Sequence, residues 1–228
     1  HGERRGAAWE GTRIFYGKIA AMAATRRNAS PPSAGRTGAA RNRLRIIGGD
    51  WRSRIVRFPD ADGLRPTPDR VRETLFNWLG QRLDGLACVD LFAGSGALGF
   101  EARSRGASRV TMIERDRRVC DHLRASLADL GAEGVEVVQA DAIAWLARAG
   151  DRYDLAFVDP PYASGLAGPS LAALEPRLVP GARVYVEAAE TVVPPSAAWA
   201  CKREASAGAV KFALFEYLPG TSPSPQTP

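Results

Sequence analysis

The run from Val89 to Gly99 constrains the fold of this chain more than any other stretch of its sequence. It begins as an apolar strand and passes abruptly into a loop with glycines at 94, 96 and 99. Glycines at this spacing allow a sharp turn, a close approach of backbone N–H groups to a ligand, and tight packing of the following helix on a sheet. The sequence therefore predicts a strand, a ligand-binding loop and a helix.

An acidic residue follows this loop at the spacing expected of a nucleotide site. The β-rich run 109–114 ends in Glu114, twenty residues after Gly94. A carboxylate placed there accepts hydrogen bonds from ribose hydroxyl groups. The loop does not end in Gly-Lys-Ser/Thr, which argues against a phosphate-binding P-loop. The spacing suits either a dinucleotide or S-adenosylmethionine.

Strand and helix patterns alternate through the centre of the chain, which predicts an α/β fold with a doubly wound parallel sheet. We expect strands at 86–92, 109–114, 135–139 and 153–159 and helices at 96–105, 116–130 and 141–149. A helix at 171–178, a strand at 182–187 and an antiparallel pair at 198–203 and 209–217 would complete seven strands. Ligands of such sheets bind beyond the carboxyl ends of the strands, where Gly94, Glu114, Asp141 and Asp159 fall.

Residues 41–85 form an N-terminal extension that is rich in arginine. Strands at 44–47 and 51–58 around Gly48 and Gly49 predict a β-hairpin, and Asp69 is expected to cap a helix. Arginine beside an aromatic side chain suits phosphate contact and base stacking; the alternative is a charged sheet edge that prevents edge-to-edge pairing. The candidate RNA-binding residues are Arg45, Trp51, Arg52, Arg54, Arg65, Arg70 and Arg72.

Composition limits the remaining possibilities. The 228 residues suffice for one α/β domain, here 86–218, with expected disordered tails at 1–40 and 219–228. Residues 1–54 carry twelve basic and three acidic side chains, as an arm that meets a polyanion would. Three cysteines without C-x-x-C spacing and two histidines predict no disulfide, no metal site and no His-based triad. We expect no membrane span and a cytoplasmic, monomeric protein.

The stretch Asp159-Pro160-Pro161-Tyr162 is the most specific chemical signal in the chain. It places a carboxylate, two consecutive prolines and an aromatic residue directly after an apolar strand. The prolines withdraw two N–H donors and leave carbonyl oxygens as acceptors. The Asp159 carboxylate and the Pro160 carbonyl can together receive both hydrogens of an exocyclic amine, directing the nitrogen lone pair toward an electrophilic methyl group. Tyr162 would stack on the base, for roughly 1–3 kcal/mol.

These residues resemble the Asp/Asn-Pro-Pro-Tyr/Phe motif of amino-group methyltransferases, and the run from Asp90 to Gly96 resembles their S-adenosylmethionine loop. Together with 45–49 and 65–79, the match is to the RsmD family, and it covers about 44–217. The resemblance implies a Rossmann-like class I methyltransferase that methylates N2 of guanine 966 in bacterial 16S rRNA, within a small-subunit particle. Asp50 departs from the neutral polar residue expected in that family.

The resemblance also implies roles for individual residues. Asp90, Ala93, Gly94 and Gly96 would hold the methionine part of S-adenosylmethionine. Glu114 would bind the ribose hydroxyls, and Asp141 with Ala142 the adenine edge. Asp159, Pro160 and Tyr162 would form the catalytic set, without a metal ion.

Two other enzyme classes share part of this pattern. An NAD-dependent oxidoreductase has the glycine loop and the acidic residue but leaves 159–162 unexplained. A DNA N6-adenine methyltransferase shares the chemistry, although it usually carries a larger target-recognition region than 41–85.

Overall fold

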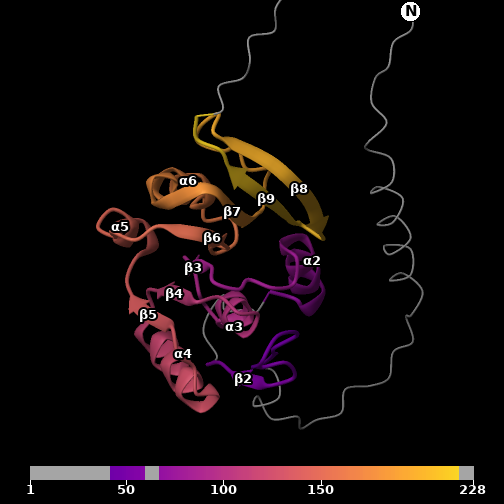
Figure 1. Ribbon diagram of the computed structural model, residues 1–228, viewed down its shortest axis with the longest axis vertical. Helices are drawn as coiled ribbons and strands as arrows, with labels where there is room; N and C mark the ends of the chain where they lie inside the picture. The colour runs from indigo at the N-terminus through magenta and orange to yellow at the C-terminus, as the bar shows by residue number, and fades with distance from the viewer. Residues whose placement is uncertain (1–41, 60–66, 221–228) are drawn as a thin grey trace, which may run out of the picture. The chain divides into compact units, whose positions relative to one another are not determined.

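The computed structural model describes residues 42–59 and 67–220 (Figure 1). The expected tail at 1–40, most of the tail at 219–228, and Arg65 lie outside these residues. All three cysteines lie within them and are free thiols. In this part of the chain, no helix combines the length and apolar character needed to cross a membrane.

A seven-stranded sheet forms the centre of the fold. Its strands, in spatial order, are β5 (Val135–Gln139), β4 (Arg109–Glu114), β3 (Ala87–Asp90), β6 (Tyr153–Val158), β7 (Leu178–Ala188), β9 (Val210–Tyr217) and β8 (Trp199–Ala207). Strands β3 to β7 are mutually parallel, and β9 runs antiparallel to both β7 and β8. The predicted mostly parallel, seven-stranded class I methyltransferase sheet is confirmed. The chain order reverses between β3 and β6, which is where such sheets bind ligands.

Helices cover both faces of the sheet. One face packs against α2 (Asp69–Leu79), α3 (Ala97–Ser104) and α4 (Arg117–Leu130), and the other against α5 (Ala142–Leu146), α6 (Ala167–Leu174) and the 3-10 turn η2 (Glu175–Arg177). Along β6, Leu155 and Phe157 enter the first core, whereas Ala156 and Val158 enter the second. A strand buried on both faces reads as a continuous apolar run, as it does in this sequence.

The N-terminal hairpin is shorter than its sequence predicts. Strand β1 (Arg43–Arg45) pairs antiparallel with β2 (Ile55–Arg57). The expected strand at 51–58 is wrong in its first half, because residues 51–53 form a turn in which Ser53 adopts φ = 68°. The hairpin contributes Leu44 and Val56 to the same core as α2 and α3.

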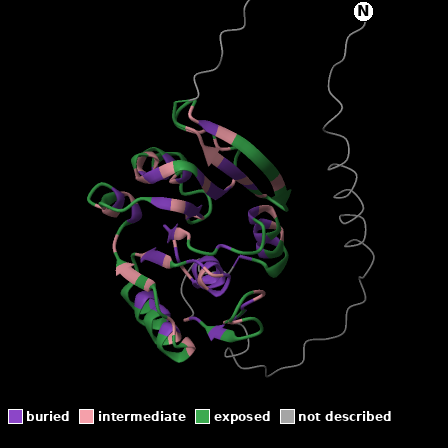
Figure 2. Ribbon diagram, in the orientation of Figure 1, coloured by how far each residue is buried: buried purple, intermediate pink, exposed green. Residues whose placement is uncertain are grey.

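A buried carboxylate joins this hairpin to α3, which is buried over seven of its eight residues (Figure 2). Glu101 accepts hydrogen bonds from the backbone amides of Ile47 (2.9 Å) and Gly48 (2.8 Å). It also forms ion pairs with Arg72 (3.3 Å) and Arg105 (2.6 Å). Arg72, a candidate RNA-binding residue, is not accessible to RNA: its side chain is fully buried, where it pairs with the Glu101 carboxylate inside the core.

Three helices also differ from the expected ranges. Helix α5 ends at Leu146 and not at 149. Pro68 takes the N-cap position of α2, so Asp69 is its first helical residue, and its carboxylate pairs with Arg72 instead of capping the backbone. The helix expected at 171–178 lies at Ala167–Leu174. Pro169 lies in the first turn of α6, where a helix tolerates proline. Pro176 follows the last turn and disfavours continuation of the helix. Leu178 belongs to β7.

Candidate active site

The glycine loop after β3 has the geometry that its sequence predicts. Gly94 and Gly96 adopt φ of 50° and 80°, the left-handed region that favours glycine. A side chain at Gly96 would also collide with the Phe100 ring. A Cβ at Gly99 would lie 2.9 Å from the side chain of Met112 on β4, so this glycine lets α3 pack directly on the sheet.

Glu114, at the carboxyl end of β4, is tied to this loop. Its Oε2 accepts a hydrogen bond from the amide of Gly94 (3.0 Å), and its Oε1 accepts one from the amide of Asp116 (2.8 Å). Each carboxylate oxygen has two lone-pair directions. Both oxygens of this half-buried side chain therefore keep acceptor capacity for ligand hydroxyl groups.

Asp90, the last residue of β3, lies beneath the loop with 2% of its surface exposed. Its Oδ2 accepts a hydrogen bond from the amide of Gly99 (3.1 Å), whereas its buried Oδ1 has no partner among the described residues. Burial, and then the negative charge of Asp159, raise the pKa of Asp90 to about 7. A cationic ligand group would supply what this carboxyl lacks, which fits the positively charged methionine part of S-adenosylmethionine.

The ends of β5 and β6 complete the same edge of the sheet. Asp141 follows β5 and caps α5, with its Oδ1 accepting from the amide of Ala144 (2.9 Å). Ala142 is buried beside it, as Ala93 is in the glycine loop. Because β3 to β6 are neighbouring parallel strands, the structure places Gly94, Glu114, Asp141 and Asp159 along one edge.

Asp159 directly follows β6 and is half-buried. Its Oδ2 accepts from the hydroxyl of Thr67 (3.4 Å), which precedes α2. Burial raises the pKa of Asp159 to about 6, against the lowering effect of this hydrogen bond. The sequence analysis missed Thr67, because nothing in the local pattern shows that residues 92 positions apart meet.

The rest of the Asp-Pro-Pro-Tyr segment is open to solvent. The Pro161 carbonyl accepts from the amide of Ser164 (3.0 Å), whereas the Pro160 carbonyl has no hydrogen-bond partner within residues 42–59 and 67–220. Tyr162 is 65% exposed. An acceptor carboxylate, a free carbonyl and an exposed aromatic ring thus stand together at the end of β6.

The sequence analysis also missed a carboxyl group close to Asp159, on strand β7, which neighbours β6. Glu187 is 8% exposed and accepts a hydrogen bond from Tyr185 (2.8 Å). It ends the expected strand at 182–187, so the rule that selected Glu114 and Asp159 could have found it.

The candidate RNA-binding residues divide between two ends of the fold. Arg70 is exposed in the first turn of α2, and the Arg45 guanidinium lies 3.8 Å from the carboxylate of Asp69 in the same turn. Both are near Thr67 and therefore near Asp159. The turn with Trp51 and Arg52 instead bonds to Ser104, at the far end of α3, roughly 10 Å of helix from the glycine loop.

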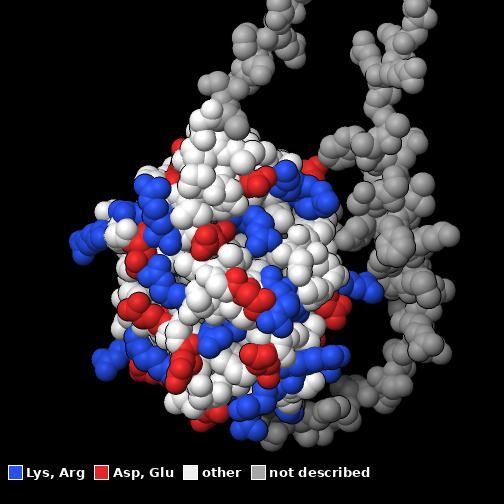
Figure 3. All heavy atoms as spheres, in the orientation of Figure 1, with Lys and Arg blue, Asp and Glu red and all other residues white. Residues whose placement is uncertain are grey.

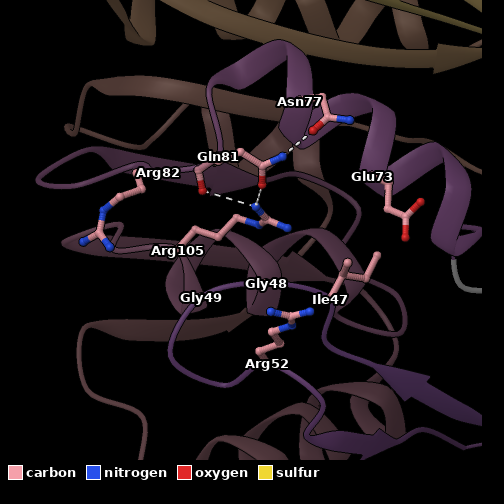
Figure 4. A pocket seen from close by; sticks show the side chains of 9 residues that line it. All are labelled: Ile47, Gly48, Gly49, Arg52, Glu73, Asn77, Gln81, Arg82 and Arg105. Carbon is pink, nitrogen blue, oxygen red and sulfur yellow. Dashed lines mark hydrogen bonds between the residues drawn. The ribbon is translucent and has the colours of Figure 1, made fainter.

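Arg52 lines a polar pocket of about 470 Å³ between this turn and the C-terminal part of α2. Figure 4 shows the Arg105 guanidinium of this pocket hydrogen-bonded to the backbone and side chain of Gln81. Arg54 donates to the carbonyl of Asp129 on α4 (3.0 Å). None of the residues that line this pocket belongs to the carboxylate-lined edge, so the pocket is a separate feature.

Figure 3 shows basic and acidic side chains interspersed on the visible face.

The sheet order, the glycine loop that follows Asp90 and the Asp-Pro-Pro-Tyr segment after β6 define a class I methyltransferase. A family model described as conserved hypothetical protein 95 matches residues 44–216. The ribosomal RNA small subunit methyltransferase D of Escherichia coli strain K12 is 46% identical over 177 residues, which cover 76% of this chain and 89% of that protein. The protein of the same name from Haemophilus influenzae is 38% identical and covers 78% and 95%.

Solved structures agree. A structure described as a putative methyltransferase from E. coli has a TM-score of 0.72 at 45% identity, covering 77% of this chain and 98% of that one. The chain belongs to the ribosomal RNA small subunit methyltransferase D family.

Proposed function

We propose that this protein transfers a methyl group from S-adenosylmethionine to the exocyclic N2 amine of guanine 966 in 16S rRNA, within a small-subunit particle in the bacterial cytoplasm. The observation that carries the proposal is the pair of open acceptors, Asp159 and the Pro160 carbonyl, at the strand end next to the glycine loop. Family membership supplies the substrate, because the E. coli relative is a ribosomal RNA small subunit methyltransferase. We propose that the protein acts as a monomer.

The cofactor is assigned to the edge formed by β3, β4 and β5. Glu114 binds the ribose hydroxyls, and Asp141 with the amide of Ala142 binds the adenine edge. Asp90 and the loop at Ala93, Gly94 and Gly96 hold the methionine part, whose positive charge offsets the buried carboxyl of Asp90. When bound, S-adenosylmethionine supplies a methyl group made electrophilic by its sulfonium.

Asp159 and Pro160 orient the nucleophile. The carboxylate and the carbonyl oxygen each accept one N–H of the guanine N2 amine, which favours a pyramidal nitrogen with its lone pair toward the methyl group. Tyr162 stacks on the base, which must leave its own stack to reach the site. After transfer one N–H bond of the methylated nitrogen breaks, and its proton passes to an oxygen of Asp159 or to water.

The RNA approaches from the carboxyl ends of the strands. Arg45 and Arg70 are exposed close to Thr67 and are assigned to phosphate contacts beside the target base. Trp51, Arg52 and Arg54 are assigned to a second contact area at the far end of α3. Arg72 has no part in binding, because it is buried against Glu101.

Labelled S-adenosylmethionine and small-subunit particles from a strain that lacks this methylation test the proposal. We expect label in N2-methylguanosine after digestion of the 16S rRNA to nucleosides. Asp159→Ala should abolish transfer, because the amine loses its carboxylate acceptor, yet bind S-adenosylmethionine nearly as tightly in calorimetry. Label in N6-methyladenosine, or wild-type turnover by Asp159→Ala, would contradict the proposal.

A further inference from the structure

Asp159 has a second carboxyl group beside it. Val158, the last residue of β6, pairs in register with Val186 of β7. Asp159, which directly follows β6, therefore comes next to Glu187 of β7. Adjacent strands lie about 4.8 Å apart. Both side chains point to the face that carries Phe157 and Tyr185, against which α2 and α3 pack.

Glu187 is held in place by its own strand. Tyr185, which is fully buried, donates its hydroxyl to Oε1 of Glu187 at 2.8 Å. The Oε2 atom of Glu187 has no hydrogen-bond partner in the described part of the chain. One oxygen of this carboxyl is therefore fixed, and the other is available to its neighbour.

The groups whose charges act on this pair are carboxyls, whereas the nearby Arg45 and Arg70 are exposed to solvent. The charge of Asp159 raises the pKa of Glu187 on β7 and of Asp90 on β3, and Tyr185 lies on the same strand as Glu187. From the described residues just before α2, Thr67 contributes an uncharged hydroxyl that donates to Asp159. Within residues 42–59 and 67–220, no lysine or arginine forms an ion pair with any of the three carboxyls. Among the described residues, no ion-paired cation therefore compensates a second negative charge.

Two carboxyl groups so placed do not ionise together, because each charge raises the cost of the other. Burial, and then the charge of Asp159, raise the pKa of Glu187 to about 8, against the lowering effect of the Tyr185 hydrogen bond. The pKa of Asp159, raised by burial, is lower, at about 6. At neutral pH the pair thus holds one proton, on Glu187, and one charge, on Asp159.

We propose that Glu187 is a positioning residue for Asp159: fixed by Tyr185, its neutral carboxyl turns a proton toward Asp159 and keeps that carboxylate as the single charged acceptor for the target amine. This inference rests on the proposed function. Loss of the proton places two like charges on adjacent strands and displaces Asp159 from the amine.

Single-turnover methylation of small-subunit particles, measured against pH, tests this role. In the wild type the rate should fall above pH 8, by about tenfold one unit higher. Glu187→Ala should lower the rate about tenfold or more at neutral pH, with the KM for particles unchanged. Glu187→Gln, whose amide donates a hydrogen as the neutral acid does, should restore most of this loss and remove the alkaline fall. Glu204→Gln, at an exposed position of β8, is the matched control.

Tyr185→Phe tests the direction in which the alkaline fall of the rate moves. Its hydroxyl lowers the pKa of Glu187, so removing it should move the alkaline fall to higher pH. A titration of the guanine itself would persist unchanged in every variant. The same alkaline fall in the wild type, Glu187→Gln and Tyr185→Phe would overturn the proposal.

Infrared spectroscopy gives a readout that does not require methylation. Asp90, whose pKa is also raised to about 7, would contribute to the same signal, so the comparison is made in an Asp90→Asn background. That cofactor-free protein should show the C=O band of a neutral carboxylic acid at pH 7, and adding Glu187→Gln should remove it. If the band persists in Glu187→Gln, Glu187 is not the proton carrier. If the band behaves as expected but no particle is methylated, the proposed function fails and the proton assignment stands.

Discussion

Asp90 destabilises the cofactor-free fold at neutral pH. Its pKa is raised from the usual value near 3.8 to about 7. A carboxyl whose pKa is raised by folding binds more protons in the folded state than in the unfolded state between these two values. The free energy of unfolding therefore falls as pH rises through this window. Asp90 thus lowers the stability of the cofactor-free protein, a cost that the proposed binding of the cationic cofactor would offset.

Asp90→Asn should separate stability from binding. We expect the melting temperature of the cofactor-free variant to exceed that of the wild type at pH 8, by at least roughly 2–4 °C, and the gain to vanish near pH 4. Affinity for S-adenosylmethionine should fall, because the amide carries no charge. Calorimetric unfolding across this pH range checks the result, and a variant less stable than the wild type at pH 8 would refute it.

Glu114→Ala should weaken S-adenosylmethionine binding, because the ribose hydroxyls lose a charged acceptor. Hydrogen bonds to charged groups contribute roughly 1.5–3 kcal/mol each. Isothermal titration calorimetry should show a loss of this order. Glu136→Ala, at an exposed position of β5, is the control and should bind as the wild type does. Equal affinities for the two variants would remove Glu114 from the ribose site.

At the scale of elements, the hairpin, α2 and α3 are joined through Glu101. Its carboxylate receives two backbone amides of the hairpin segment, one arginine of α2 and Arg105. Removal of one partner from a buried ion pair leaves an uncompensated charge and costs about 3–5 kcal/mol. This cluster therefore fixes where the arginine-bearing hairpin stands relative to the methyltransferase sheet.

Glu101→Ala should lower the free energy of urea unfolding by an amount of that order, because the buried guanidinium groups of Arg72 and Arg105 would lose their shared carboxylate and only the half-exposed Asp69 would remain beside Arg72. Arg82→Ala is the comparison, since its ion pair with Asp84 is exposed. That variant should unfold at the wild-type urea concentration. If both variants unfolded alike, the buried cluster would not be what secures the hairpin.

The exposed arginines near Asp159 should show the salt signature of phosphate contacts. Arg45→Ala and Arg70→Ala should each weaken RNA binding and reduce the slope of log affinity against log salt by about one unit. Arg148→Ala, exposed beyond α5, should change neither. Filter binding of a 16S rRNA fragment at several salt concentrations measures this. An unaltered slope for the double variant would place the RNA elsewhere.

The sheet could be predicted from sequence because its strands are local apolar runs with polar residues at their ends. The same rule located Glu114, Asp141 and Asp159. The predictions that were wrong concern residues whose surroundings are made by distant segments of the chain. Arg72 reads as an exposed helical arginine until Glu101, 29 residues away, is placed against it.

Helix α6 was misplaced for a different reason. Pro169 reads as a helix breaker, although the first turn of a helix tolerates it. The hairpin turn at 51–53 was read as strand because its residue types suit one. Whether such residues form a strand depends on the neighbouring strand against which they pack, and the sequence of one segment does not show that neighbour.

For the whole molecule, the cofactor residues, Asp159 and the first turn of α2 lie at the edge formed by the carboxyl ends of the parallel strands. The turn of the hairpin stands at the opposite end of α3. An RNA that touches both areas must extend along the face covered by α2 and α3. This geometry favours a folded ribosomal particle over a short single strand as the substrate.

The nucleotide that is modified tests the central claim most directly. The protein, and separately Asp159→Ala, would be expressed in a bacterium that lacks its own enzyme for this position, and fragments of its 16S rRNA analysed by mass spectrometry. We predict one added methyl group on N2 of guanine 966 with the wild type and none with Asp159→Ala. A methyl group at another nucleotide, or equal methylation by the two proteins, would contradict the account.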